Sequence, residues 1–241
     1  MHAPTAIAAL GVWERGQGQD QTERGLALLT LAYAGASRES LADLSIGERD
    51  GVLLSLREAM FGPRLEACLD CPHCGAAMEL DFTTDRMRAG APAQGVLTLD
   101  ESGFRLSLRP VTSRDLMICA QAGSGDPRLA LLSQCLVWAE CGGEAVSAAD
   151  LPAPVIDAAS RALSDADPQA DVTLNVVCGA CGKSWQAPFD ILSYLWDELE
   201  AWARRMLADV HTLARAYGWR EADILALNPL RRRCYLDMVA P

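Results

Sequence analysis

The sequence is short of basic side chains and has no long apolar run. Lysine and arginine number 21 against 32 aspartates and glutamates, which gives a formal net charge of −11 and a pI near 4.7. This balance argues against a nucleic-acid-binding surface, because such surfaces displace counterions from phosphates with basic side chains. No stretch approaches the ~20 apolar residues that span a bilayer, and no apolar signal region follows a charged start. We therefore expect a cytoplasmic chain without a membrane anchor.

Histidine is also scarce, and the common catalytic motifs are missing. The three histidines are His2, His73 and His211, and none belongs to the His-x-Glu pair of a zinc deaminase. The sequence also lacks a Gly-x-x-x-x-Gly-Lys phosphate loop, a Gly-x-Ser-x-Gly elbow and a His-Glu-x-x-His helix. Half of the residues are hydrophobic and 22% are charged, so a folded core is expected. We predict a folded protein that is not an enzyme and has no small-molecule substrate.

Cysteine, by contrast, is abundant. The nine cysteines are Cys68, Cys71, Cys74, Cys119, Cys135, Cys141, Cys178, Cys181 and Cys234. Four of them form two matched Cys-x-x-Cys-Gly units, at 71–75 and 178–182. This pattern is typical of zinc knuckles, in which a tight turn closed by glycine directs two thiolates at one ion. Two knuckles supply four sulfurs, which fill the tetrahedral shell of a structural zinc site formed by Cys71, Cys74, Cys178 and Cys181.

Strand-like segments flank both knuckles, at 77–82, 171–177 and 183–187, which predicts a zinc ribbon. The knuckles lie roughly a hundred residues apart, against ~15–20 in a compact ribbon, so the ribbon is expected to carry a large insertion. A redox motif is the alternative, but neither unit lies in a strand–turn–helix context. Cys68 offers a competing pair with Cys71, and we interpret it as a spare. The remaining four cysteines are expected to be small core residues; they are Cys119, Cys135, Cys141 and Cys234.

Between and before the knuckles the pattern is mainly helical. Helices are predicted from Thr22 to about Gly35 and from about Ser45 to Gly62. A β-hairpin is predicted over 95–109, with its turn at 100–103. Thr112 and Asp115 resemble a capping box, and helix candidates follow at 116–122, 127–138 and 154–163.

The last third contains a heptad pattern. Its apolar positions are Leu192, Trp196, Leu199, Ala203, Met206, Val210, Leu213 and Tyr217. Such a seam predicts a helix that packs lengthwise on another helix, with Asp190 as its N-cap and Gly218 just beyond its end. The partner helix could lie in this chain or in another protein, and the irregular side-chain sizes favour packing within the chain. A short helix over 221–227 and a last helix around 231–236 are expected to follow.

These elements predict an α+β fold that is mostly helical. It contains a small antiparallel zinc-ribbon module, closed by the two distant knuckles, and a C-terminal helical hairpin. The expected division is an N-terminal helical part (1–63), a split zinc ribbon with the β-hairpin (64–109 and 171–189), a helical insertion (110–170) and a C-terminal helical region (190–241).

Several segments together resemble a known family. They are Trp13–Gly16, Ile46–Asp50, Leu56–Gly62, the first knuckle, Ala166–Asp171, Trp185–Asp190, Tyr217–Leu227 and Arg231–Leu236. This constellation resembles the chaperone-like baseplate hub assembly proteins of contractile-tailed, T-even-like phages, which also occur in phage-derived contractile injection systems. The resemblance covers nearly the whole chain, and the C-terminal segments are its most specific part.

The resemblance implies a non-enzymatic protein that builds or occupies the hub of a tail baseplate by docking on hub or wedge proteins. It would act in the cytoplasm during assembly, or stay in the virion or injection-system particle. We expect the partner surface in the C-terminal helices, at Trp196, Trp202, Trp219, Arg231, Arg232 and Tyr235. The alternative is a zinc-ribbon transcriptional regulator or nucleic-acid adaptor that uses Arg231 to Arg233. These arginines are more typical of a solvated face or of internal ion pairs.

Overall fold

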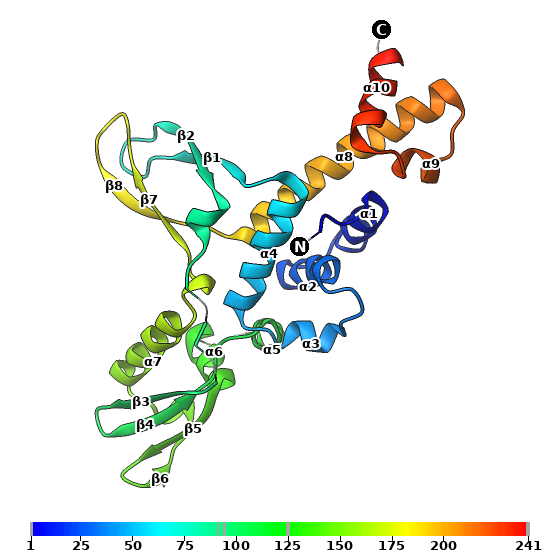
Figure 1. Ribbon diagram of the computed structural model, residues 1–241. Coiled ribbons are helices and arrows are strands. Elements are labelled where there is room, and N and C mark those ends of the chain that lie inside the picture. The colour runs from blue at the N-terminus through cyan, green and yellow to red at the C-terminus, as the bar shows by residue number, and fades with distance from the viewer. Residues whose placement is uncertain (1, 91, 94, 124–125, 240–241) are drawn as a thin grey trace.

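The structure is a computed structural model, and it describes residues 2–90, 92–93, 95–123 and 126–239. The fold is α+β, with helices and small antiparallel sheets, as predicted. Figure 1 shows a central group of helices, a pair of β-hairpins and a separate sheet beside it, and a long helix that projects away and ends in two short helices.

The central group is built mainly from segments at the two ends of the chain, with one helix from its middle. It contains α1 (Ala6–Arg15), α2 (Gln21–Ala32), α3 (Arg38–Ala42), α4 (Ile46–Phe61), α5 (Ser113–Ala122) and the first half of α8 (Ile191–Tyr217). Leucines from α2, α4 and α8, among them Leu28, Leu53 and Leu195, are fully buried in one core. The predicted helices from Thr22 and Ser45 correspond to α2 and α4, whereas α1 was not predicted. The Gly- and Gln-rich residues 16–19 follow this ten-residue helix directly, and their composition led to the whole start of the chain being interpreted as non-helical.

Both knuckles sit between paired strands. The first lies between β1 (Arg64–Asp70) and β2 (Ala77–Thr83), and the second lies between β7 (Thr173–Val177) and β8 (Ser184–Pro188). Each pair is antiparallel and forms its own two-stranded sheet, with Asp70 opposite Ala77 and Val177 opposite Ser184. The short 3₁₀ turn η1 (Thr84–Met87) follows β2. Figure 1 shows the two hairpins side by side at one end of the helical group.

Other residues between the knuckles form a second small core. It consists of a four-stranded sheet in the order β3 (Leu97–Glu101), β4 (Phe104–Leu108), β5 (Leu136–Cys141) and β6 (Glu144–Ala145), with α6 (Pro127–Cys135) and α7 (Ala153–Ala166). The 3₁₀ turns η2 (Ala148–Asp150) and η3 (Pro168–Ala170) complete this region. Leu106 and Leu108 of the sheet pack with Val155 and Ala159 of α7 in a core that is separate from the central one.

Two expectations about this region need correction. The helix predicted over 127–138 ends at Cys135, and the chain continues directly into β5. A run of apolar residues cannot by itself distinguish a helix from a strand. The hairpin at 95–109 was expected to belong to the ribbon, but β4 pairs with β5 along its length. The segment 110–170 is therefore not purely helical. The four-part division of the chain stays a prediction.

The C-terminal region matches the seam. Asp190 caps α8 by accepting a hydrogen bond from the backbone N–H of Leu192, and Gly218 adopts a left-handed conformation at the other end with φ 68°. The first five seam residues and Leu213 are buried, so the seam packs within the chain. The helices α9 (Glu221–Leu225) and α10 (Pro229–Val239) follow and pack against the far half of α8.

Close packing holds α1 against α8 in the central group. Gly16 ends α1 directly against the indole of Trp196 on α8, where an added Cβ would overlap the ring. The guanidinium of Arg24 lies 4.7 Å from the same ring, and its Nε donates to the Gly16 carbonyl. A glycine is required here because the backbone lies against the outer carbons of the indole ring and leaves no space for a side chain.

A buried carboxylate joins the second core to α4. Asp167 accepts a hydrogen bond from the backbone N–H of Gly47 at 2.9 Å, in the first turn of α4. That turn already carries a capping box formed by Ser45 and Glu48. Helix N-termini leave backbone donors unsatisfied and favour negative charge, so Asp167 supplies what the turn lacks. The segments around Gly47 and Asp167, which carried part of the family resemblance, therefore meet in space.

Candidate metal centre

The two knuckles have matching backbone geometry. In the first, the N–H of Gly75 donates to the carbonyl of Cys71 at 2.8 Å, and in the second, the N–H of Gly182 donates to that of Cys178 at 2.9 Å. Both glycines have φ 72°, a conformation that side chains with a Cβ rarely adopt. The repeated Cys-x-x-Cys-Gly sequence therefore folds into the same tight turn twice.

The two turns place the sulfur atoms of their four cysteines in one cluster. The Sγ atoms of Cys71 and Cys181 lie 3.8 Å apart, those of Cys74 and Cys178 lie 3.7 Å apart, and all four lie within 4.8 Å of one another. Zinc bound to sulfur at ~2.3 Å in a tetrahedron places its ligands about 3.8 Å from each other, whereas a disulfide needs ~2.05 Å. The cluster thus fits a tetrahedral ion and is unlike a disulfide.

Two of the four clustered cysteines are buried and two are exposed to solvent. The first cysteine of each knuckle, Cys71 or Cys178, is buried, and the second, Cys74 or Cys181, is exposed. In the described part of the chain this is the one group of three or more His, Cys, Asp or Glu side chains with such spacing. Because all four ligands are cysteines, the donor set favours zinc or another thiophilic ion over magnesium or calcium.

The ionisation of the thiols is uneven. The backbone N–H of Cys181 lowers the pKa of the Cys178 thiol to about 6, against the opposing effect of burial. The backbone N–H of Ala76 lowers the pKa of Cys74, but hydrogen bonds with the sulfurs of Cys181 and Cys71 raise it to about 12. Four thiolates this close repel one another, so a divalent cation is the group that would let all four ionise together.

Neighbouring candidates lie outside the cluster. Cys68 is exposed on β1, opposite Glu79 of β2, and is not part of the group of four. His73 is exposed within the first knuckle and donates its backbone N–H to the Cys71 sulfur at 3.4 Å. Of the cysteines expected in the core, Cys135 is buried, Cys119 and Cys141 are half-buried, and Cys234 is exposed. The expectation for Cys234 is therefore wrong.

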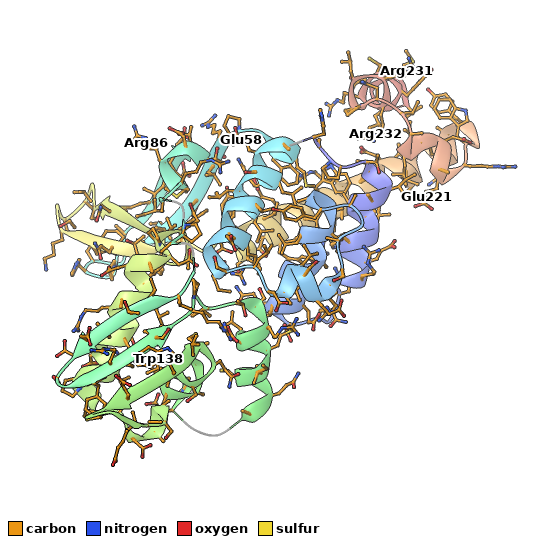
Figure 2. All side chains as sticks on the ribbon, turned by 60° about the horizontal axis from the view of Figure 1, so that its bottom comes forward. Glu58, Arg86, Trp138, Glu221, Arg231 and Arg232 are labelled. Carbon is orange, nitrogen blue, oxygen red and sulfur yellow. The ribbon has the colours of Figure 1, made fainter. Side chains whose placement is uncertain are left out.

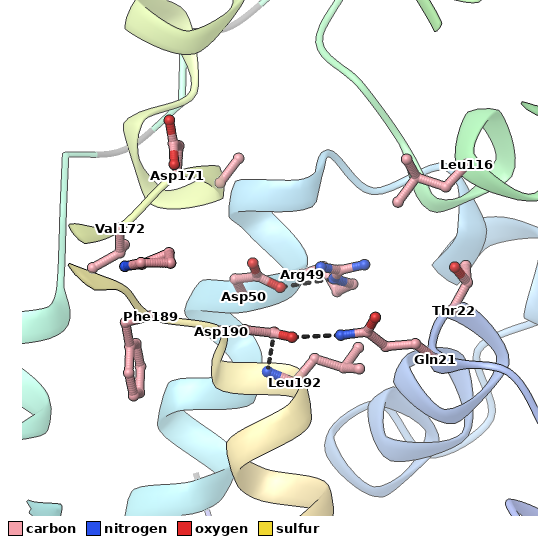
Figure 3. Close-up of a pocket in the computed structure, with 12 residues that line it drawn as sticks. Gln21, Thr22, Arg49, Asp50, Leu116, Asp171, Val172, Phe189, Asp190 and Leu192 are labelled. Atoms are coloured by element: carbon pink, nitrogen blue, oxygen red, sulfur yellow. Dashed lines mark hydrogen bonds and ion pairs between the residues drawn. The ribbon is translucent and has the colours of Figure 1, made fainter. Parts of the chain in front are cut away.

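A second candidate site is a cavity of about 290 Å³ between α2, α4, α8 and the strand-flanking residues 170–172. Figure 3 shows its polar wall, where Arg49 and Asp50 form a buried ion pair with 2.7 Å between Nε and Oδ1. Burial raises the pKa of Asp50, although Arg49 opposes it. Asp190 accepts hydrogen bonds from Gln21, from Ser193 and from the first turn of α8. These groups stabilise the junction of the three helices.

The predicted partner residues divide into two groups. Trp196 is 2% exposed and packs inside the central group, so it is not available to a partner, and that prediction is wrong. A large aromatic on a helical seam is chiefly a core residue, as the contact with Gly16 shows. Trp202 is half-buried beneath α1 against Leu10.

The other four predicted residues lie on the projecting end of the molecule. The ring of Trp219 stacks on that of Tyr217 at 4.6 Å and meets that of Tyr235 edge-on at 4.9 Å. Arg232 is 9% exposed and pairs with Asp209 of α8 at 3.4 Å, so it is an internal ion-pair residue. Arg231 is exposed, and Figure 2 shows it on the outer side of the tip.

The comparisons with known proteins concern the larger part of the chain. The model of the family described as T4 bacteriophage base plate protein matches residues 12–196. The chain belongs to this family. The match includes both knuckles, the insertion between them and the beginning of α8. Searches of curated proteins and of solved structures found no significant match.

Membership in this base plate family indicates a baseplate-associated role and interaction with other baseplate proteins, and it suggests a virion-associated, non-enzymatic protein. Among the described residues no helix is both long and apolar enough to cross a membrane. The segments Tyr217–Leu227 and Arg231–Leu236, expected to be the most specific part of the resemblance, lie beyond the matched residues. The tip formed by α9 and α10 is thus a feature of this chain outside the matched region.

Proposed function

We propose that the four clustered cysteines bind one structural zinc ion and that the two hairpins form a zinc ribbon around it. The sulfur distances and the matched turns support this proposal. The ion would link the β1–β2 hairpin to the β7–β8 hairpin, which are separated by the whole insertion in sequence. Each hairpin has two strands and a small buried surface, so such a link would supply much of the stability of this module.

The zinc would have no catalytic role. Four cysteine thiolates complete a tetrahedral shell and leave no position for water or substrate. The cavity described above is lined by residues that cap and pair the helices of the fold. We therefore propose a non-enzymatic protein without a small-molecule substrate.

We further propose that the protein acts in assembly of the baseplate hub of a contractile tail or contractile injection system, or is one of its components. Its partners would be hub or wedge proteins, met in the cytoplasm during assembly, and it would leave the finished particle or remain in it. Family membership supports this role. The acidic charge balance, with 32 acidic against 21 basic side chains, also favours protein partners over nucleic acid.

The decisive experiment is co-purification with individually co-expressed hub and wedge proteins. We expect a stable complex with at least one of them, and none with double-stranded DNA at low salt. Binding to none of these proteins, or DNA binding that weakens with salt and is lost in the triple variant Arg231→Ala, Arg232→Ala and Arg233→Ala, would contradict the proposal. A variant that lacks the C-terminal helices should be truncated from Trp219 onward. It would then keep α8, which carries buried core residues such as Leu195 and Leu199.

A further inference from the structure

The outer face of α10 carries an apolar stripe. Leu230, Cys234 and Met238 follow one another at intervals of four residues, which places them on one side of a helix. Leu230 is 75% exposed and Met238 72%, the highest values among the large hydrophobic side chains exposed in the described residues, and Cys234 between them is exposed as well. The stripe extends over two turns, about 12 Å along the helix axis.

The helix cannot rotate to bury this stripe. Its opposite face is already docked on α8, through the Arg232–Asp209 ion pair at 3.4 Å. Tyr235, on the same inner face, packs edge-on against Trp219 with ring centroids 4.9 Å apart. Turning the stripe inward would expose Tyr235 and break the ion pair of a nearly buried arginine. The stripe is therefore held toward the outside by the fold itself.

Charged groups border the stripe on both sides. Arg231 lies on one side, exposed and without an ion-pair partner among the described residues. On the other side Arg233 pairs with Asp237 at 3.0 Å on the helix surface. The helix thus carries three arginines and one aspartate, in a chain whose formal net charge is −11. Arg232 and Arg233 each have an ion-pair partner, so Arg231 is the one arginine of α10 that no ion pair neutralises among the described residues, on a molecule of net negative charge.

We propose that the stripe of Leu230, Cys234 and Met238 is a docking surface for the apolar face of an acidic amphipathic helix on another baseplate protein. The inference rests on the proposed function, because it assumes a baseplate partner, and it identifies the chemistry of that partner. Apolar side chains of the partner helix cover the stripe, and its flanking carboxylates pair with Arg231. The tip projects away from the body of the molecule in Figure 1, which leaves room for such a helix.

The charges of the tip disfavour two other occupants. In a symmetric dimer through α10, two helices that each carry three arginines and one aspartate would meet, and like net charges across an interface oppose association. A nucleic acid would meet the unpaired Arg231 and the two exposed apolar side chains of Leu230 and Met238. Apolar side chains form hydrogen bonds with neither phosphates nor base edges. An anionic membrane surface shares the requirement for basic and apolar groups, and the experiment separates it from a protein partner.

The test uses the full-length chain and each hub or wedge protein purified singly, with affinity measured by calorimetry. We expect the double variant Leu230→Glu/Met238→Glu to weaken binding at least tenfold. The single variant Arg231→Glu should weaken it severalfold, with a smaller loss at high salt. Val96→Glu is the matched control, since Val96 is an exposed hydrophobic at 57% and lies before the sheet of the insertion. It should leave the affinity unchanged.

Cys234 supplies a direct footprint, because it lies in the middle of the stripe. Its rate of alkylation by N-ethylmaleimide should fall at least tenfold in the complex, while the exposed Cys68 on β1 keeps its rate. The same alkylation rate is measured with vesicles of phosphatidylglycerol and with the isolated chain at high concentration. These two measurements test a membrane and a second copy of the chain as the occupant of the stripe.

Three results would overturn the docking proposal. They are a complex in which Cys234 stays as reactive as in the free chain, full affinity of the double variant, and protection of Cys234 by vesicles or by self-association in place of a partner. Absence of binding to every hub and wedge protein would instead contradict the proposed function. The two failures are therefore distinguishable.

Discussion

Arg57 on α4 and Glu198 on α8 form a bidentate ion pair, although 141 residues separate them in sequence. The distances are 2.8 Å from Nε to Oε2 and 2.7 Å from Nη2 to Oε1. Arg57 is almost fully buried and also donates to the carbonyl of Gly62, at the end of its own helix. The pair therefore joins the start of the first knuckle hairpin to the helix that leaves the second.

Glu198→Gln is expected to destabilise the fold by about 1–3 kcal/mol, because it leaves a buried guanidinium without its charge partner. The measurement is urea unfolding followed by circular dichroism. Glu200→Gln on the same helix is the control, since Glu200 pairs with an Arg204 side chain that is 72% exposed, and the change should cost less than ~0.5 kcal/mol. Equal effects of the two variants would contradict the role of the Arg57 pair.

Gly16→Ala should destabilise the protein by about 1–3 kcal/mol, because the new methyl group overlaps the Trp196 ring. Gly51→Ala is the matched control on α4, where an added Cβ meets open space and an ordinary helical backbone. It should stabilise the protein by roughly 0.5–1 kcal/mol. Thermal unfolding of both variants measures the difference, and a neutral Gly16→Ala would show that α1 is not held against α8 as described.

Gly47 and Asp167 should be energetically coupled. Gly47→Ala brings a methyl group onto the Asp167 carboxylate, and Asp167→Ala removes the acceptor of the Gly47 N–H, so each alone should cost about 1–2 kcal/mol. In the double variant the clash is gone, and its cost should be smaller than the sum of the two. A double-mutant cycle from urea unfolding measures this coupling, and simple additivity would contradict the contact.

The stability should fall in acid partly because of Asp115. Burial raises its pKa, but hydrogen bonds from Arg109 at 2.7 Å and from Thr112 lower it more, to below the ordinary value of 3.8. The unfolded chain therefore binds this proton first, so the contribution is complete above pH 3.8 and is lost as the pH falls through the folded pKa. The difference in free energy of unfolding between wild type and Asp115→Asn should shrink in this range. A constant difference from pH 6 to pH 2.5 would contradict this assignment.

Local sequence rules predicted many of the elements correctly. Ser45 and Glu48 form a capping box at a predicted helix start, Thr112 and Asp115 form another, and Asp190 and Gly218 bound the long helix where expected. These features depend on residues within one turn of each other, so the sequence pattern contains the necessary information.

Features that depend on distant pairing could not be predicted in this way. The pairing of β4 with β5 joins the hairpin at 95–109 to a strand in the segment 110–170, and the apolar run before Trp138 looks equally like a helix. Trp196 was expected at an interface because aromatic residues are common there, and only the contact with Gly16 shows that it is buried. Asp167 gives no signal of its role, because its acceptor function depends on a helix N-terminus 120 residues away.

Zinc content is the most direct test of the proposed zinc ribbon. Under competition from EDTA, the purified full-length chain should retain one zinc per chain by native mass spectrometry. Each of Cys71→Ser, Cys74→Ser, Cys178→Ser and Cys181→Ser should lose it, and the control Cys68→Ser should keep it. Retention of zinc by all four variants, or a wild-type chain that holds no stoichiometric metal and forms disulfides among these cysteines, would contradict the account.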